Sequence, residues 1–88
     1  MIDPQENSKQ LLAWFRDLMG GIVTHPDAVE ITESHDDMGL LFVVRVHKED
    51  RGRVIGSTGK NADALRLLLR CAGGSRDLRA ALKIDVPR

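Results

Sequence analysis

Two glycines that enclose two small hydroxyl residues, followed at once by a lysine, form the stretch of this sequence best suited to bind an anion. The run is Gly56-Ser57-Thr58-Gly59-Lys60, and Arg53 lies three residues before it. Glycine permits a sharp bend and leaves the backbone amides open to an approaching ligand. A helix beginning at Lys60 would add unpaired amides and the positive end of its dipole. The pattern is typical of a phosphate-binding loop.

Two other interpretations of this loop can be weighed on the residues alone, an ordinary turn and a Walker A loop. A bare G-x-x-G occurs in many ordinary turns between helices, so the glycines by themselves do not identify a binding site. A Walker A loop needs a further glycine, separated by four residues from its Gly-Lys pair, and a Ser or Thr after that pair. This chain has Val54 and Asn61 in those places. The sequence therefore excludes a nucleoside-triphosphate site of that kind.

The charge is balanced over the whole chain but not along it. Thirteen basic and thirteen acidic residues give a net charge of zero, which argues against a protein that coats nucleic acid by bulk attraction. Residues 1–40 carry two basic and eight acidic side chains, whereas residues 51–70 carry five basic side chains and one acidic. Positive charge therefore gathers around the glycine loop, as a local contact with a nucleic-acid backbone requires.

Hydrophobic spacing predicts two longer helices and one short helix. The first helix begins at Asp3-Pro4 and ends at Gly20-Gly21. The short helix carries Val54 and Ile55, and the last runs from Lys60 to Ala72 before Gly73-Gly74 stops it. The expected core stripes recur at helical spacing; they consist of Leu11, Trp14, Phe15 and Leu18 in the first helix and Leu65, Leu68, Leu69 and Ala72 in the last, with Leu67 off the stripe.

Alternating apolar and polar residues predict three strands. They cover residues 28–33, residues 40–47 and the stretch that holds Leu82, Ile84 and Val86. A polar turn of several residues, 34–39, joins the first two strands into a hairpin. Phe42, Val44 and Val46 share one face, and apolar residues on the other face favour a subunit contact. The order is helix, strand, strand, short helix, loop, helix, strand, which is α+β.

Nothing in the sequence indicates an enzyme. His25, His35 and His47 fall in a turn, a loop and a strand end, without the spacing of a metal site, so we expect no metal and no cofactor. No nucleophile, base and orienting group come together. The single cysteine, Cys71, excludes an internal disulfide and is expected to be buried. With no signal peptide and no apolar run of membrane-spanning length, we expect a cytoplasmic protein without a membrane or small-molecule partner.

Beyond single motifs, the element order resembles a type II KH domain, αββααβ with a three-stranded sheet and its helices on one face. The run Val54-Ile55-Gly56-Ser57-Thr58-Gly59-Lys60 is similar to the KH signature V-I-G-x-x-G-[KR]. His25-Pro26-Asp27 before a strand, Glu49-Asp50 before the short helix and Ala64-Leu65-Arg66 after the loop make the chain resemble the KhpA family of small bacterial RNA-binding proteins. We expect one KH domain over residues 1–88, with 1–7 as a helix cap or partly ordered segment and 87–88 as a tail.

The resemblance implies that the chain clamps about four nucleotides of single-stranded RNA. The residues it implies for this clamp are Gly52, Arg53, Ile55, Gly56, Ser57, Thr58, Gly59 and Lys60, with Ile84 or Val86 beside the apolar floor. It also implies a post-transcriptional regulator or RNA chaperone that forms a homodimer or pairs with a second KH-containing protein. The uncharged middle of the loop, and Asp36 and Asp37 in the variable loop, depart from strong binders and predict modest affinity.

Two alternatives to RNA binding remain at the level of the sequence. The chain could be a protein–protein assembly module whose groove has weak or vestigial nucleic-acid binding, which the zero net charge and Leu67 favour. The short helix, turn and helix could also imitate a DNA-binding helix-turn-helix. The leucines that crowd the helix after the turn leave few side chains to read bases, which weakens this second alternative.

Overall fold

The computed structural model of the chain describes residues 4–85, with side chains from residue 6 onward, and it has the predicted KH-like αββααβ order. The helices and strands are α1 (Pro4–Ile22), β1 (Glu30–Asp36), β2 (Gly39–Arg45), α2 (Arg51–Ile55), α3 (Lys60–Gly74) and β3 (Ala80–Asp85). Short 3-10 turns cover residues 26–28, 48–50 and 57–59. No helix within the described part is both long enough and apolar enough to cross a membrane.

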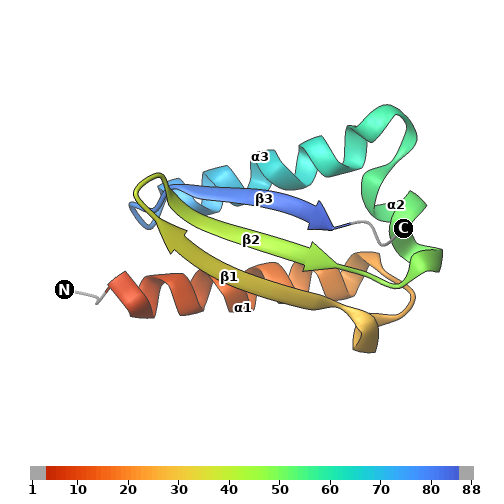
Figure 1. The fold of residues 1–88 in the computed structure, drawn as a ribbon, viewed down its shortest axis with the longest axis horizontal. Helices are drawn as coiled ribbons and strands as arrows, with labels where there is room; N and C mark the ends of the chain where they lie inside the picture. The colour runs from red at the N-terminus through yellow and green to blue at the C-terminus, as the bar shows by residue number, and fades with distance from the viewer. Residues whose placement is uncertain (1–3, 86–88) are drawn as a thin grey trace.

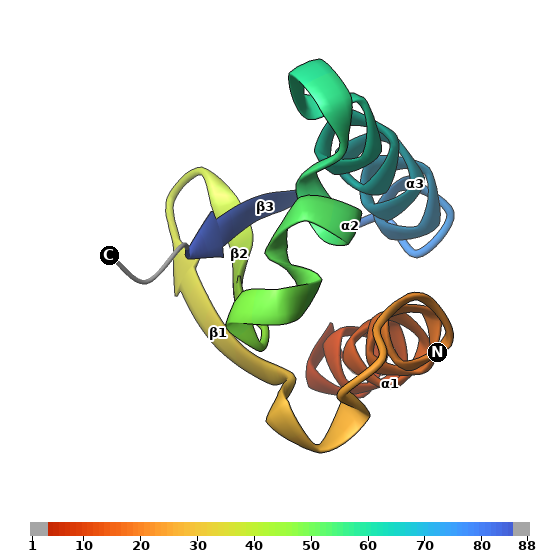
Figure 2. The ribbon, with the colours of Figure 1, turned by 90° about the vertical axis from the view of Figure 1, so that its right-hand side faces the viewer.

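The three strands form one sheet in the order β1-β2-β3, with α1 and α3 side by side on one of its faces (Figures 1 and 2). β1 and β2 are antiparallel, and Phe42 lies opposite Glu33. β2 and β3 are parallel, and Phe42 also lies beside Leu82. A parallel pair needs a crossover, and the segment with α2, the glycine loop and α3 provides it. The loop therefore lies at one end of the sheet, where β2 leaves it (Figure 1).

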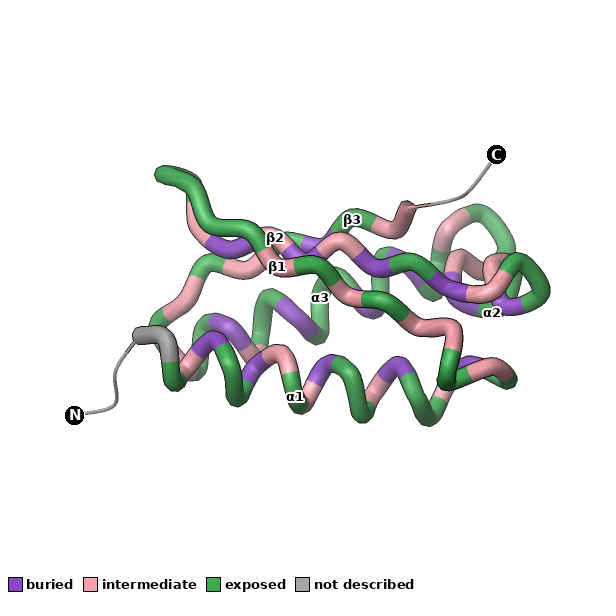
Figure 3. The backbone as a smooth tube through the Cα atoms, turned by 60° about the horizontal axis from the view of Figure 1, so that its bottom comes forward, coloured by how far each residue is buried: buried purple, intermediate pink, exposed green. Residues whose placement is uncertain are grey.

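The core lies between the sheet and the two long helices, and buried positions alternate along β2 (Figure 3). Phe15 of α1 and Phe42 of β2 are both fully buried, and their ring centroids are 5.8 Å apart in a tilted arrangement. The other buried apolar side chains come from both long helices, α2, β2, β3 and the segments beside them, and include Leu11, Met19, Val23, Leu40, Val44, Val46, Val54, Leu65, Leu69 and Leu82. β1 contributes Ile31, which is half-buried against this core. Val54 thus packs α2 against the core immediately before the glycine loop.

Both long helices run past the glycines that were expected to end them. α1 continues through Gly20 and Gly21 to Ile22, and the amide of Val23 still bonds to the Met19 carbonyl at 3.1 Å. Burial of Val23 outweighs the low helix propensity of glycine. α3 includes Gly73, where a side chain would lie 3.0 Å from the Leu78 carbonyl oxygen. Gly73 therefore lets the chain leading to β3 pack against α3.

The buried stripes of the helices are also narrower than predicted. In α1 the fully buried positions are Leu11, Phe15 and Met19, while Trp14 and Leu18 lie half-buried at the edge of the core. In α3 the prediction was wrong for Leu68, which is 46% exposed, and Ala72 is half-buried. Cys71 was expected to be buried but is exposed. A helix that touches one sheet contacts it along a narrow strip, so residues one position to either side lie at the edge of the core or face the solvent.

The hairpin loop is shorter than the sequence indicated. β1 extends to Asp36 and β2 begins at Gly39, so only Asp37 and Met38 lie between the strands. The amide of Met38 donates to Oδ1 of Asp36 at 2.7 Å, which is the Asx turn that this residue type favours. Gly39 has a φ of 125°, a value open to glycine, and this tight turn replaces the predicted loop of several residues.

Candidate nucleic-acid interface

The glycine loop joins α2 to α3 through a bend that only glycine adopts readily at its first position. Gly56 has φ 80° and ψ 168°, and its amide donates to the Gly52 carbonyl at 2.8 Å, which closes α2. A Cβ atom placed on Gly56 would lie 2.7 Å from Cγ and 2.9 Å from the backbone nitrogen of Asn61. Gly56 is therefore required for its backbone conformation and for the close approach of α3.

The remaining loop residues turn the chain into α3. Thr58 and Gly59 both have left-handed backbone conformations, with φ values of 59° and 79°. The amide of Gly59 donates to the Gly56 carbonyl at 3.2 Å, and the amide of Lys60 donates to the Ser57 carbonyl. Ser57 and Thr58 are exposed at the tip. The predicted bend is thus present, and its two hydroxyl residues face the solvent.

Asn61 supports the loop and was not among the predicted site residues. Its Nδ2 donates to the backbone carbonyl of Arg53 at 2.7 Å, which joins the first turn of α3 to the end of α2 across the bend. The sequence carried a signal for this contact, because Asn side chains at helix starts often bond to nearby backbone groups. Asn61 positions the loop, whereas the predicted residues form its surface.

The loop and the helices beside it present positive charge to the solvent. Arg53 and Lys60 are exposed on either side of the bend. Residues 51–60 contain three basic side chains and no acidic one. Further along α3, Arg66 is engaged elsewhere, because its Nη1 lies 3.1 Å from Oδ1 of Asp63 and its Nε donates to the Leu82 carbonyl. The charge available at the loop itself therefore comes from Arg53 and Lys60.

An apolar hollow of about 310 Å³ lies next to the loop, between α1, α2 and α3. Arg53 and Asn61 form its edge on the side of the loop. The other lining residues are Leu18, Ile22, Val54, Ala64, Leu65 and Leu68. The floor expected at Ile55 and Ile84 does not belong to this hollow. Both of those residues are half-buried, and Val86 lies outside the described residues.

A buried carboxylate holds the start of α2 in place. Asp50, which is 1% exposed, accepts bonds at Oδ1 from the Thr24 amide at 2.9 Å and the Thr24 hydroxyl at 2.7 Å. Its Oδ2 accepts from the His25 amide at 3.0 Å. Burial alone would raise the pKa of Asp50, but the bonds from Thr24 and His25 together outweigh it and lower the pKa to about 2. The ionised side chain therefore ties α2 to the end of α1.

Comparison with known proteins gives this architecture a family. The family model described as "KhpA/KhpB, KH domain" matches residues 14–84, a range that includes the glycine loop, β1, β2 and all of β3 but its last residue. The chain belongs to the KhpA/KhpB KH-domain family. The resemblance predicted from the loop signature and the element order is thereby confirmed.

Individual relatives agree with this assignment. The chain is 41% identical over 63 residues to the RNA-binding protein KhpA of Listeria monocytogenes, covering 72% of this chain and 83% of that protein. It is 44% identical over 65 residues to KhpA of Leifsonia xyli subsp. xyli, covering 74% and 86%. For KhpA of Streptomyces coelicolor the identity is 42% over 69 residues, covering 78% and 85%. All three names describe binding proteins, in agreement with the expectation that the chain is not an enzyme.

Proposed function

We propose that this chain is a type II KH domain over residues 1–88 that clamps about four nucleotides of single-stranded RNA at the glycine loop. The observation that carries the proposal is the bend at Gly56–Gly59, which exposes Ser57 and Thr58 between two exposed cationic residues in a segment without a carboxylate. The family supports it, because its KhpA members are named RNA-binding proteins. The proposed RNA-binding residues are Gly52, Arg53, Ile55, Gly56, Ser57, Thr58, Gly59 and Lys60.

The proposed contact is with the phosphate backbone and not with base edges. A phosphate at the tip would meet the backbone of Ser57 and Thr58, the start of α3 with its dipole, and the charge of Lys60. Arg53 would meet the next phosphate along the strand. Base stacking has little support, because the three aromatic residues of the chain include Phe15 and Phe42, which are fully buried. The clamp is therefore expected to tolerate many sequences.

The decisive experiment is RNA binding by fluorescence anisotropy with a mixed single-stranded pool. The variant Ser57→Asp/Thr58→Asp places two negative charges against the phosphates and should nearly abolish binding. The matched control Ser57→Asn/Thr58→Asn has side chains of the same size without the charge, and Asn also tolerates the left-handed backbone at residue 58. It should retain most of the affinity. Equal binding by the folded Asp and Asn variants would show that the loop does not hold the phosphates.

The dependence on salt measures how many phosphates are held. A clamp on two to four phosphates predicts a slope of log K against log salt of about −1.5 to −3 for a single strand. A much steeper slope would mean that RNA follows a broader basic surface. Within this proposal the protein acts in the cytoplasm as a post-transcriptional regulator or RNA chaperone, and its single cysteine agrees with a reducing compartment.

A second candidate, assembly with another protein, has its own support in α3. Leu67 and Leu68 are 57% and 46% exposed, and Leu68 also lines the hollow between the helices. We propose that this helix pairs with a second copy of the chain or with another KH-containing protein, so that two weak clamps would bind one RNA with higher avidity. The variant Leu67→Gln/Leu68→Gln should then sediment as a monomer where the unmodified chain sediments as a dimer. If the unmodified chain is already a monomer, pairing with itself is excluded.

A further inference from the structure

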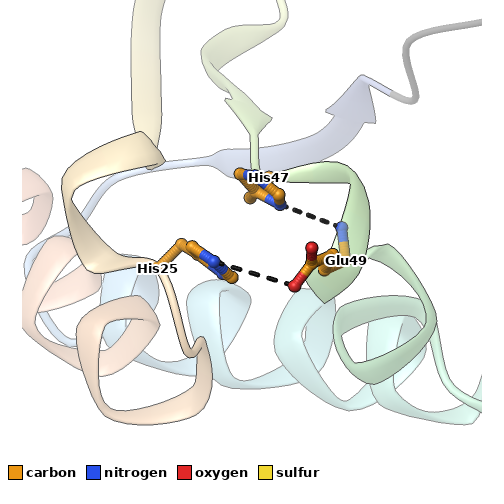
Figure 4. A group of neighbouring side chains, drawn as sticks. All are labelled: His25, His47 and Glu49. Atoms are coloured by element: carbon orange, nitrogen blue, oxygen red, sulfur yellow. Dashed lines mark hydrogen bonds and ion pairs between the residues drawn. The ribbon is translucent and has the colours of Figure 1, made fainter.

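Two histidines from distant parts of the chain stack face to face beside a glutamate (Figure 4). His25 lies between α1 and β1, and His47 follows β2. Their ring centroids are 3.9 Å apart and the ring planes differ by 9°. Nε2 of His25 lies 3.7 Å from Oε2 of Glu49. Each of the three side chains offers a ligand atom within 4.8 Å of the other two, which makes them a cluster of potential metal ligands among residues 4–85.

We propose that His25, His47 and Glu49 bind one divalent transition-metal ion of the zinc class. Two imidazole nitrogens and one carboxylate oxygen are the protein donors of open zinc sites, in which water completes the coordination. Imidazole donors favour zinc, nickel or copper, whereas magnesium and calcium prefer oxygen donors throughout. The proposal is independent of RNA binding, because none of the three residues belongs to the proposed clamp.

A buried carboxylate is already in place behind His25. Oδ2 of Asp50 lies 3.4 Å from Nδ1 of His25, and the Thr24 hydroxyl oxygen lies 3.0 Å from the same nitrogen. These partners occupy Nδ1 and leave Nε2 directed toward Glu49 (Figure 4). Metal-binding histidines usually have a carboxylate or carbonyl at their second nitrogen, which fixes the ring orientation and strengthens the donor. Asp50 is buried and held by three hydrogen bonds, so it can orient His25 without itself binding the ion.

Nδ1 of His47 carries a lone pair that faces Glu49. Its Nδ1 accepts a hydrogen bond from the Glu49 amide at 3.1 Å, so this nitrogen is unprotonated in the structure. Binding at this nitrogen exchanges the amide for the ion and leaves the proton of the neutral ring on Nε2. Because the hydrogen bond between the Glu49 amide and His47 is exposed, water can replace the ring as the partner of this amide. The cost is therefore one exposed hydrogen bond.

Rotation of the side chains is needed to close the site. Ligand bonds of about 2.0–2.2 Å place tetrahedral donors about 3.4 Å apart, so the three atoms must approach from their present spacing. The side chain of His25 is 39% exposed and that of Glu49 is 65% exposed, so both can rotate without disturbing the core. In-plane coordination by both rings requires them to leave their parallel stack. Binding would therefore be visible as a change at both rings.

The metal ion would link the two segments of the chain that lie beside the start of α2. His25 is in the segment between α1 and β1, whereas His47 and Glu49 are in the segment between β2 and α2. Asp50 already links the same two segments through Thr24 and the His25 backbone. A bound metal ion would add a second link directly before the helix that leads to the glycine loop. It would also stabilise the folded chain by mass action.

The test is calorimetric titration of the full chain, without a histidine tag, with zinc and with cobalt. We expect one ion per chain at micromolar affinity. His25→Gln and His47→Gln should each weaken metal binding by about tenfold or more. Glu49→Gln, a substitution of an exposed residue, should have the same effect. The matched control is His35→Gln, because His35 is an exposed histidine whose Nε2 lies 3.0 Å from Oε1 of Glu33, away from the cluster. Its affinity should equal that of the unmodified chain.

Proton NMR of the histidine rings tests the same site without any substitution. Zinc should shift the ring signals of His25 and His47 together and leave those of His35 unchanged. Absence of heat and of ring shifts at a large excess of zinc would overturn the proposal. The same conclusion follows if His35→Gln weakens binding as much as the cluster variants do, because the metal would then bind surface histidines without preference.

Discussion

Replacing Gly56 by alanine tests whether the bend of the glycine loop depends on a missing side chain. At φ 80° and ψ 168° the residue occupies a region that is essentially restricted to glycine, and strain there amounts to about 1–3 kcal/mol. The added Cβ would also lie 2.7 Å from Cγ and 2.9 Å from the backbone nitrogen of Asn61. Overpacking against atoms that cannot move freely costs about 1–3 kcal/mol. Together the two effects predict a loss of about 2–6 kcal/mol in the free energy of unfolding.

Two neighbouring glycines provide matched controls for this prediction. Gly59 has a φ of 79°, but beyond its chain neighbours no described atom lies within 4 Å of the place that a Cβ would take, so Gly59→Ala should lose only the left-handed strain of about 1–2 kcal/mol. Gly52 lies inside α2 with open space around it, and Gly52→Ala should gain about 0.5–1 kcal/mol. The three substitutions add the same methyl group within one short segment.

Urea unfolding followed by circular dichroism measures all three variants on the same scale. The single tryptophan, Trp14, provides a second probe because it lies half-buried at the edge of the core. The reasoning requires the order Gly52→Ala, Gly59→Ala and Gly56→Ala from most to least stable. If Gly56→Ala were as stable as Gly59→Ala, the close approach of Asn61 would have no energetic weight and the packing argument would be refuted.

Two further predictions concern other parts of the fold. At the hairpin end, Gly39→Ala should lower the free energy of unfolding, measured in urea, by about 2–6 kcal/mol. The reason is that φ is 125° and the new Cβ would lie 2.6 Å from the Arg79 carbonyl oxygen. A smaller loss of unfolding free energy for Gly39→Ala than for Gly59→Ala would contradict this prediction. The pKa of Asp50 is about 2 in the folded chain against 3.8 ordinarily, so the ionised carboxylate stabilises the fold fully above pH 3.8. The urea midpoint should fall as the pH is lowered from 3.8 to about 2. Asp50→Asn should have a lower midpoint at neutral pH and lose this part of the acid dependence; an unchanged acid profile would assign it to other carboxylates.

The order of elements could be predicted because each has a local signal. The alternation around Phe42 and Val44 marks a half-buried strand, and the helical spacing of Leu65 and Leu69 marks the face that packs against the sheet. The bend at Gly56–Gly59 was predictable for the same reason, since the freedom of glycine is a property of the residue. The ends of elements were predicted less well. Gly20 and Gly73 remain helical because contacts at Val23 and with the chain leading to β3 outweigh their low propensity.

Residue types and local spacing were sufficient to predict the αββααβ order and the glycine loop with its two flanking cations, and the resemblance of these residues to a known signature indicated the family. Contacts between distant segments came only from the tertiary structure, because side chains without a shared period leave no local signal. These contacts are the burial of Asp50 beneath Thr24 and the stacking of His25 on His47. The histidines are scattered along the sequence, yet folding places His25 and His47 side by side because the connections on either side of the β1–β2 hairpin meet beside α2.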